Sequence, residues 1–146
     1  MTAATANRIT QLKNTQNAIY TEYPVEAGET IYQGCLVMVD TDGYLTLATD
    51  TTNCKVVGIA DEYVVNSGAD GAAFCRVVSN VTARLAASSV AISDFDAPLM
   101  YVVDNQTVDE TSPANSVKAG IHVPPHISTT EAWVFIPPYG MFTYGL

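Results

Sequence analysis

Two histidines are the first side chains of this sequence that could do chemistry. His122 and His126 stand four residues apart around Val123-Pro124-Pro125. An i, i+4 pair on one helical face can bind a metal ion, but two prolines exclude a helix here. In an extended segment both side chains would point the same way, which leaves a weak metal site as the alternative. We interpret them as ordinary loop histidines and expect no metal.

Three cysteines are the next candidates. Their number is odd and none stands in a CxxC spacing, which argues against a disulfide scaffold and against zinc. Cys35 and Cys75 have apolar neighbours, as reduced cysteines in a core do, whereas Cys54 lies between Asn53 and Lys55. We predict buried thiols and no intrachain disulfide.

Close carboxylates occur as Asp61-Glu62 and as Asp94 with Asp96. A glycosidase needs such a pair, but an acidic chain rich in turns produces pairs by chance. We read Asp94 and Asp96 as the cap of a helical turn over Ser93–Asp96. A small hydrolase using Asp61 or Glu62 would lack a partner residue.

The loop Asn66–Gly71 has too few oxygen ligands for a calcium loop and no lysine for phosphate. No nucleophile elbow is present. We therefore expect no catalytic residue and no cofactor, and a protein that is not an enzyme.

The elements that position these residues read as short strands about ten residues apart, without helical crossovers. This pattern predicts an all-β fold, a single antiparallel barrel or sandwich-like domain. Leu36–Val39 is short and apolar throughout, as in a strand buried on both faces. Asp42-Gly43 predicts a tight type I′ hairpin turn, and Gly58 predicts a bulge or a close backbone contact. The other expected strands include 31–32, 44–47, 55–63, 72–78, 81–85, 99–103, 106–108, 118–123 and 132–136.

The first 21 residues differ in composition from the rest. Residues 1–21 contain Arg8 and Lys13 and no acid, whereas all 15 acids follow from Glu22 onward and face only four bases. We expect an N-terminal arm (1–21) that stays extended until bound, a β-domain (22–136) and an aromatic-rich tail (137–146). The tail would either fold back as a final strand or dock on a neighbouring subunit.

The charge of the chain restricts its partners. A net charge of −9 argues against nucleic acid, because phosphate binding needs clustered Lys and Arg. Charged residues make up 14% of the chain, against about 25% in a typical domain. Such a surface is either partly covered by neighbours or made of Thr, Ser and Asn. No apolar run could span a membrane, and the absence of a signal sequence predicts synthesis in a cytosol.

The arm and the tail supply the candidate partner-binding residues. An arm that becomes ordered on binding loses entropy, so it must bury apolar anchors. The candidates are Arg8, Ile9, Leu12, Lys13, Ile19 and Tyr20 in the arm, and Tyr139, Phe142 and Tyr144 in the tail.

Read in order, several segments resemble a family of tailed-phage capsid cement (decoration) proteins. Most of them are turns and core strands, and their order is more specific than any single segment. The resemblance covers roughly residues 7–136, with departures around Ser93–Pro98 and after Pro137. The segments are Asn7-Arg8, Tyr23-Pro24-Val25, Ala27-Gly28, 31–34, Leu36-Val37, 43–45, 57–62, 66–71, 101–108, 119–121 and 133–136.

This resemblance implies a non-enzymatic protein that binds the outer face of the assembled major capsid protein shell and reinforces it against internal DNA pressure. It also implies a homo-oligomer or neighbouring cement subunits on the shell. The protein would be made in the host cytoplasm and located on the outer surface of the virion. The alternative is a glycan-binding or adhesin-like β-module displayed on a virion, for which Tyr63 and Tyr139 are the plausible exposed aromatics.

Overall fold

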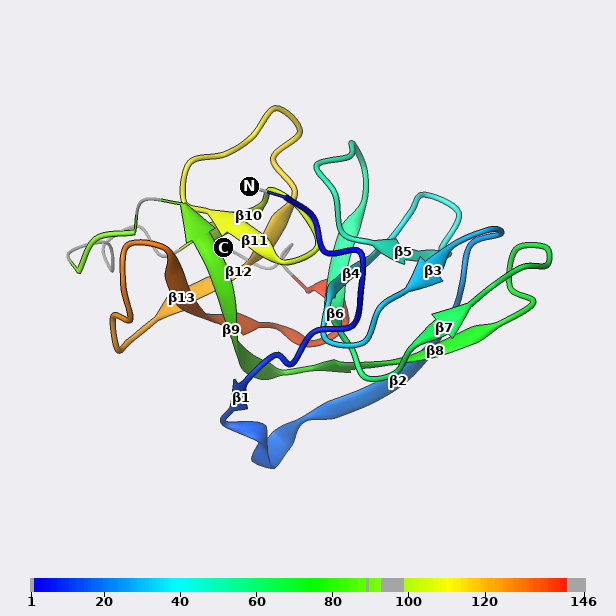
Figure 1. Ribbon diagram of the computed structural model, residues 1–146, viewed down its shortest axis with the longest axis horizontal. Helices are drawn as coiled ribbons and strands as arrows, with labels where there is room; N and C mark the ends of the chain where they lie inside the picture. Colours follow the sequence, from blue (N-terminus) through cyan, green and yellow to red (C-terminus); the bar gives the residue numbers. More distant parts are fainter. Residues whose placement is uncertain (1, 89, 93–98, 142–146) are drawn as a thin grey trace.

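The expected all-β fold is confirmed. A computed structural model describes residues 2–88, 90–92 and 99–141 of the chain. No α-helix occurs among these residues, and the strands form three sheets. Figure 1 shows a barrel on one side of the molecule and a second sheet extending away from it.

Five strands close into the barrel. They follow the order β9, β11, β10, β12 and β13, and β13 pairs again with β9. The pairs are antiparallel, as predicted, except β9 with β11, which is parallel. The bounds are β9 (Val81–Ser88), β10 (Leu99–Val102), β11 (Thr107–Asp109), β12 (Lys118–Val123) and β13 (Glu131–Ile136).

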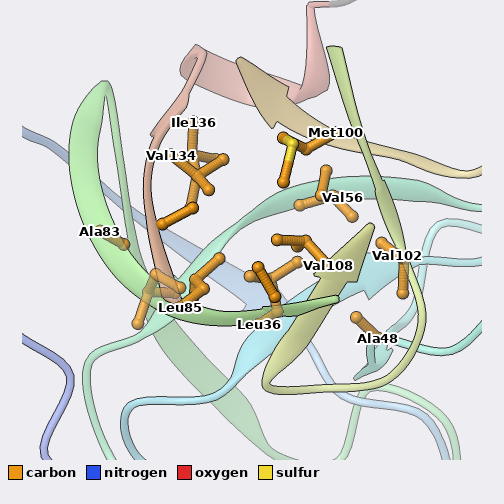
Figure 2. Packing of buried hydrophobic residues seen from close by; sticks show 14 of the residues in the cluster. Leu36, Ala48, Val56, Ala83, Leu85, Met100, Val102, Val108, Val134 and Ile136 are labelled. Carbon is orange, nitrogen blue, oxygen red and sulfur yellow. The ribbon is translucent and has the colours of Figure 1, made fainter. Parts of the chain in front are cut away.

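The barrel closes around an apolar interior because its strands alternate. In β9, Val81, Ala83, Leu85 and Ala87 are buried, each two residues after the last, so one face of the strand lines the core. Figure 2 shows Leu85 together with residues of the facing strands in one cluster. Burying a side chain such as that of Leu85 stabilises the fold by roughly 1.5–3 kcal/mol.

The second sheet packs against this cluster. Its order is β2-β8-β6-β4-β5, and a separate pair joins β3 and β7. Leu36 and Met38 of β4 enter the barrel cluster, whereas Val37 enters a second cluster on the opposite face. The strand is therefore buried on both faces, as predicted. The bounds are β2 (Ile19–Pro24), β3 (Thr30–Ile31), β4 (Leu36–Val39), β5 (Leu45–Leu47), β6 (Lys55–Ala60), β7 (Val64–Val65) and β8 (Phe74–Ser79).

Two glycines act much as their sequence context indicates. Gly58 has φ 154°, lies beside a register shift in β4, and leaves no room for a Cβ against the Val78 carbonyl oxygen. Gly43 has φ 90° in the β4–β5 hairpin. The expected type I′ turn is wrong, however, because Asp42 is not left-handed. The Asp40 carbonyl accepts from Gly43 N, the pattern of a three-residue loop that ends on a left-handed residue.

At both ends of the β-domain predicted for residues 22–136, the secondary structure differs from the prediction. The boundary at Glu22 falls inside β2, which pairs with β8 along its full length. A further short strand, β1 (Leu12–Lys13), pairs with β9. At the other end the described part of the tail forms a 3-10 helix, η2 (Pro138–Gly140), against β6 and not a final strand.

Candidate docking surface

The N-terminal segment, residues 2–13, lies across the body in an extended conformation. Its middle is fixed to the loop before β4: Arg8 N donates to the Gln33 carbonyl (2.9 Å), and Gln33 N donates to Asn7 Oδ1 (2.9 Å). Farther along, Arg84 N of β9 donates to the Gln11 carbonyl (2.9 Å). The segment is thus held by backbone hydrogen bonds on both sides of Ile9.

The start of the segment is fixed by a buried amide. Ala4 N donates to Asn105 Oδ1 (2.8 Å), and Asn105 Nδ2 donates back to the Ala4 carbonyl (2.9 Å). Asn105 is only 2% exposed. A buried amide without partners would cost about 1–3 kcal/mol, so these bonds tie the segment to the β10–β11 turn.

Close approach of the two backbones depends on Gly34. Its φ is 86°, and a Cβ there would overlap the Arg8 carbonyl oxygen. The Thr10 hydroxyl donates to the Gly34 carbonyl (2.5 Å). A side chain at position 34 would therefore push the segment off the body.

A groove of about 240 Å³, the docking groove, runs between this segment and the second sheet. One wall comes from the segment, and the floor comes from β6 and β8. The lining residues are Arg8, Ile9, Thr10, Leu12, Gln33, Gly34, Ile59, Ala60, Asp61 and Val78.

Three of the expected partner-binding residues, Arg8, Ile9 and Leu12, meet at the docking groove. Leu12 packs partly against the barrel cluster, whereas the side chain of Ile9 is 100% exposed. Tyr20, 58% exposed, pairs in register with Val78 of the groove floor. The groove thus carries the exposed Ile9 side chain on a fixed backbone, and Tyr20 lies on the strand that pairs with its floor strand β8.

Two charged residues, Arg8 and Asp61, line the groove. Arg8 is half-buried and its Nη1 donates to the Gln106 carbonyl (3.4 Å); burial lowers the pKa of Arg8. Asp61 Oδ2 is 2.7 Å from Arg76 Nε, and this hydrogen bond raises the pKa of Arg76. The lining of the groove therefore includes one residue of each charge sign.

Asp61 and Glu62, the carboxylates considered for hydrolysis, both contact Arg76. Glu62 Oε2 accepts from Arg76 N (2.8 Å) and lies 3.9 Å from Arg76 Nη1. They serve here in a surface ion-pair network. Asp94 and Asp96 lie outside the described residues.

Lys13 and Ile19 do not line the docking groove. Lys13 Nζ lies 4.3 Å from the centre of the Trp133 ring and donates to the Pro124 carbonyl (3.1 Å). Ile19 is half-buried and pairs with Ser79 at the start of β2. In the tail, Tyr139 is exposed in η2, away from the groove, and Phe142 and Tyr144 lie outside the described residues.

The other residues considered for chemistry do not form a site. His122 is buried in β12, and His126 follows beyond Pro124-Pro125. Among the described residues, no group of three or more His, Cys, Asp or Glu could hold a metal ion. All three cysteines are free thiols; Cys35 and Cys75 are buried, as predicted, and Cys54 is half-buried, against our prediction that all three are buried.

The sequence reading missed the body side of the docking groove. From the sequence, Ile59 and Val78 are predicted only as strand residues, and Asn105 only as part of a turn. Gly34 was the one available signal, because a glycine before an apolar strand marks a place of close backbone approach.

No protein-family model matches this chain, and no curated protein matches it. In the part of the chain that the structure describes, no helix is long and apolar enough to cross a membrane.

Proposed function

We propose that this protein is a non-enzymatic capsid cement protein that binds the outer face of the assembled phage major capsid protein shell. The observation that carries the proposal is the exposed Ile9 side chain on a backbone fixed at both sides, next to the docking groove. A single exposed isoleucine is unremarkable on a protein surface. The proposed role of Ile9 is supported by the docking groove beside it and by the exposed Tyr20.

Fixing the backbone before binding favours docking. A segment that becomes ordered only on binding loses conformational entropy, which weakens the complex. Residues 7–11 already have their hydrogen bonds to the body, so Ile9 can enter a partner pocket with little further ordering. The sequence resemblance implies that this partner is the major capsid protein.

The surface charge agrees with a protein partner. The net charge of −9 disfavours nucleic acid, and the low content of charged residues suits a surface that neighbours cover. On this proposal the protein lies on the outer surface of the virion, after synthesis in the host cytoplasm. Neighbouring cement subunits, or a homo-oligomer, complete the layer.

Co-sedimentation with intact shells tests the proposal. The full-length protein should sediment with assembled shells, saturate, and raise the temperature at which the shells release their DNA. Free capsid protein subunits are the control, because the outer face of the shell exists only after assembly. Failure to bind assembled shells would contradict the proposal.

A glycan-binding module is the second candidate, favoured by one observation. Tyr63 is exposed, and its ring lies 6.1 Å from that of Tyr32. Such a pair could stack on a sugar ring. A glycan array with the same preparation separates the two functions: binding that is lost in Tyr63→Ala and kept in Ile9→Ser would support the adhesin-like module.

A further inference from the structure

Four of the six basic residues have partners within the chain. Arginines and lysines in a chain with 15 acids are expected to form ion pairs. Each of these four contacts a carboxylate, a backbone carbonyl or an aromatic ring. They are Arg76 with Asp61, Arg84 with Glu131, Arg8 with the Gln106 carbonyl, and Lys13 with Trp133.

The two remaining bases, Lys55 and Lys118, line the same hollow. Within residues 2–88, 90–92 and 99–141, no carboxylate oxygen lies within 4 Å of either ammonium group. The hollow, here called the basic hollow, measures about 210 Å³ and lies at the starts of β6 and β12. Two lysines that have no carboxylate partner among the described residues therefore line one hollow of an acidic protein.

The walls of the basic hollow are held in an unusual backbone conformation. Asn53 (φ 65°) and Ser116 (φ 54°) are left-handed non-glycine residues from two different loops, and Gly140 lines the hollow from η2. The loops are joined by Asn115, whose Oδ1 accepts from Thr52 Oγ1 (2.7 Å) and whose Nδ2 donates to the Asp50 carbonyl (2.7 Å). Strained residues persist only where the surroundings fix them, so this hollow is preformed.

A second hollow of opposite charge lies next to the first. It measures about 260 Å³, is lined by Glu26, Glu29 and Asp40, and shares Cys54 with the basic hollow. Burial and then the charges of Asp40 and Asp70 raise the pKa of Glu26. Burial and then the charge of Glu26 raise the pKa of Glu29. These carboxylates repel one another, so a cation from outside would stabilise them.

We propose that a second copy of this chain docks here, with Lys55 and Lys118 of one copy against Glu26 and Glu29 of the other. Both hollows are smaller than the roughly 300–1,000 Å³ typical of small-molecule sites, which favours side chains as occupants. Because the hollows share Cys54, a two-fold contact centred there satisfies both pairs at once. This contact between copies does not depend on shell binding.

The net charge of the chain opposes self-association and weakens the proposed contact between two copies. Two chains of charge −9 repel at long range, but at 0.15 M ionic strength the screening length is about 8 Å. Contacts shorter than this keep their attraction, whereas the repulsion between distant charges is screened. The contact is thus weak in dilute solution and favoured where copies are crowded side by side.

Charge reversal with complementation tests the proposal. Lys55→Glu/Lys118→Glu makes both hollows acidic, and Glu26→Lys/Glu29→Lys makes both basic. By sedimentation equilibrium, each variant alone should associate at least about 10-fold more weakly than the wild type. An equimolar mixture of the two should regain association within a few-fold of the wild type, because opposite charges then face each other in both contacts.

Lys13→Glu is the matched control, since it changes the net charge in the same direction away from both hollows; it should associate as the wild type does. Circular dichroism checks that each variant folds. If Glu26→Lys/Glu29→Lys does not fold, Thr51→Lys places a cation on the exposed rim of the same acidic hollow. A mixture that associates no better than its separate components overturns the proposal, as does a wild-type protein that stays monomeric up to about 1 mM.

Discussion

The barrel core and the N-terminal segment are stabilised by different interactions. In the barrel, side chains such as Leu85 and Val134 point inward and are removed from water. In residues 2–13, none of the side chains is fully buried, and the backbone instead bonds to Gln33, Arg84 and Asn105. The first region depends on apolar burial and the second on hydrogen bonds.

This difference explains how one small domain can keep side chains available for a partner. Side chains that fix a segment to the body are buried in that contact. A segment fixed by its backbone hydrogen bonds can keep its side chains exposed to a partner. Ile9 is the clearest case, with hydrogen-bonded neighbours on both sides and a fully exposed side chain. Changes in the two regions should therefore affect different measurements, stability in one and docking in the other.

The largest effect is expected from a cavity in the barrel. Leu85→Ala should lower the free energy of unfolding by about 2–5 kcal/mol, because Leu85 is fully buried in β9. Ile9→Ala is the matched exposed change and should stay within about 0.5 kcal/mol of the wild type. Urea denaturation measures both. Equal losses would mean that the two regions are not stabilised differently.

A smaller effect is expected from two glycines with similar backbones. Gly34→Ala and Gly43→Ala both place a side chain at positive φ, a strain of roughly 1–2 kcal/mol. Only at Gly34 does the new Cβ meet another segment, at the Arg8 carbonyl, so this variant should lose more stability. It should also speed amide exchange at Arg8. Identical melting temperatures would contradict the close packing of the N-terminal segment.

Deleting residues 2–13 should leave the β-domain folded. The expected loss is about 1–3 kcal/mol, because the deletion removes the hydrogen bonds between the segment and the body, those of Asn105 with Ala4 among them. Deleting 2–21 should cost more, since it removes half of β2, which pairs with β8. Circular dichroism melts of the two truncations distinguish these cases; equal melting temperatures would show that the first residues of β2 add nothing.

The effect that is smallest at neutral pH is the pH dependence of stability. Burial raises the pKa of Cys75 to about 12 from a usual value near 9. The pKa of Cys75 is higher in the folded protein than in the unfolded chain, so the contribution of this thiol to the free energy of unfolding is complete below pH 9. This contribution is lost as the pH rises from about 9 to 12. Cys75→Ala should flatten this alkaline decline, whereas Cys54→Ala, at a half-buried site, should flatten it less. Parallel slopes would exclude a buried Cys75 thiol.

Most of the strands could be predicted because their signals are local. The short apolar run of β4 indicates burial on both faces, and Gly43 marks the turn between β4 and β5, which pair as neighbours along the chain. The strand predicted over 81–85 likewise lies within β9. Such features depend on residues close together in sequence.

The docking groove could not be predicted in the same way, because its contacts join distant parts of the chain. Ala4 and Asn105 are 101 residues apart, and nothing in either sequence neighbourhood indicates the pair. The amide-rich composition of the first 21 residues suggested a free arm. In the structure the side chain of Asn7 and the backbone of the segment hydrogen-bond to the body. The parallel pairing of β9 with β11 is equally non-local.

The central claim is that a backbone-held segment presents Ile9 to the capsid shell, and matched substitutions at two exposed isoleucines test it most directly. Ile92 is also exposed, at 72%, and has no part in the docking groove. In co-sedimentation with intact shells, Ile9→Ser should bind about 10-fold more weakly than the wild type, with an unchanged melting temperature. Ile92→Ser should bind as the wild type does. Equal binding by wild type, Ile9→Ser and Ile92→Ser would contradict the account.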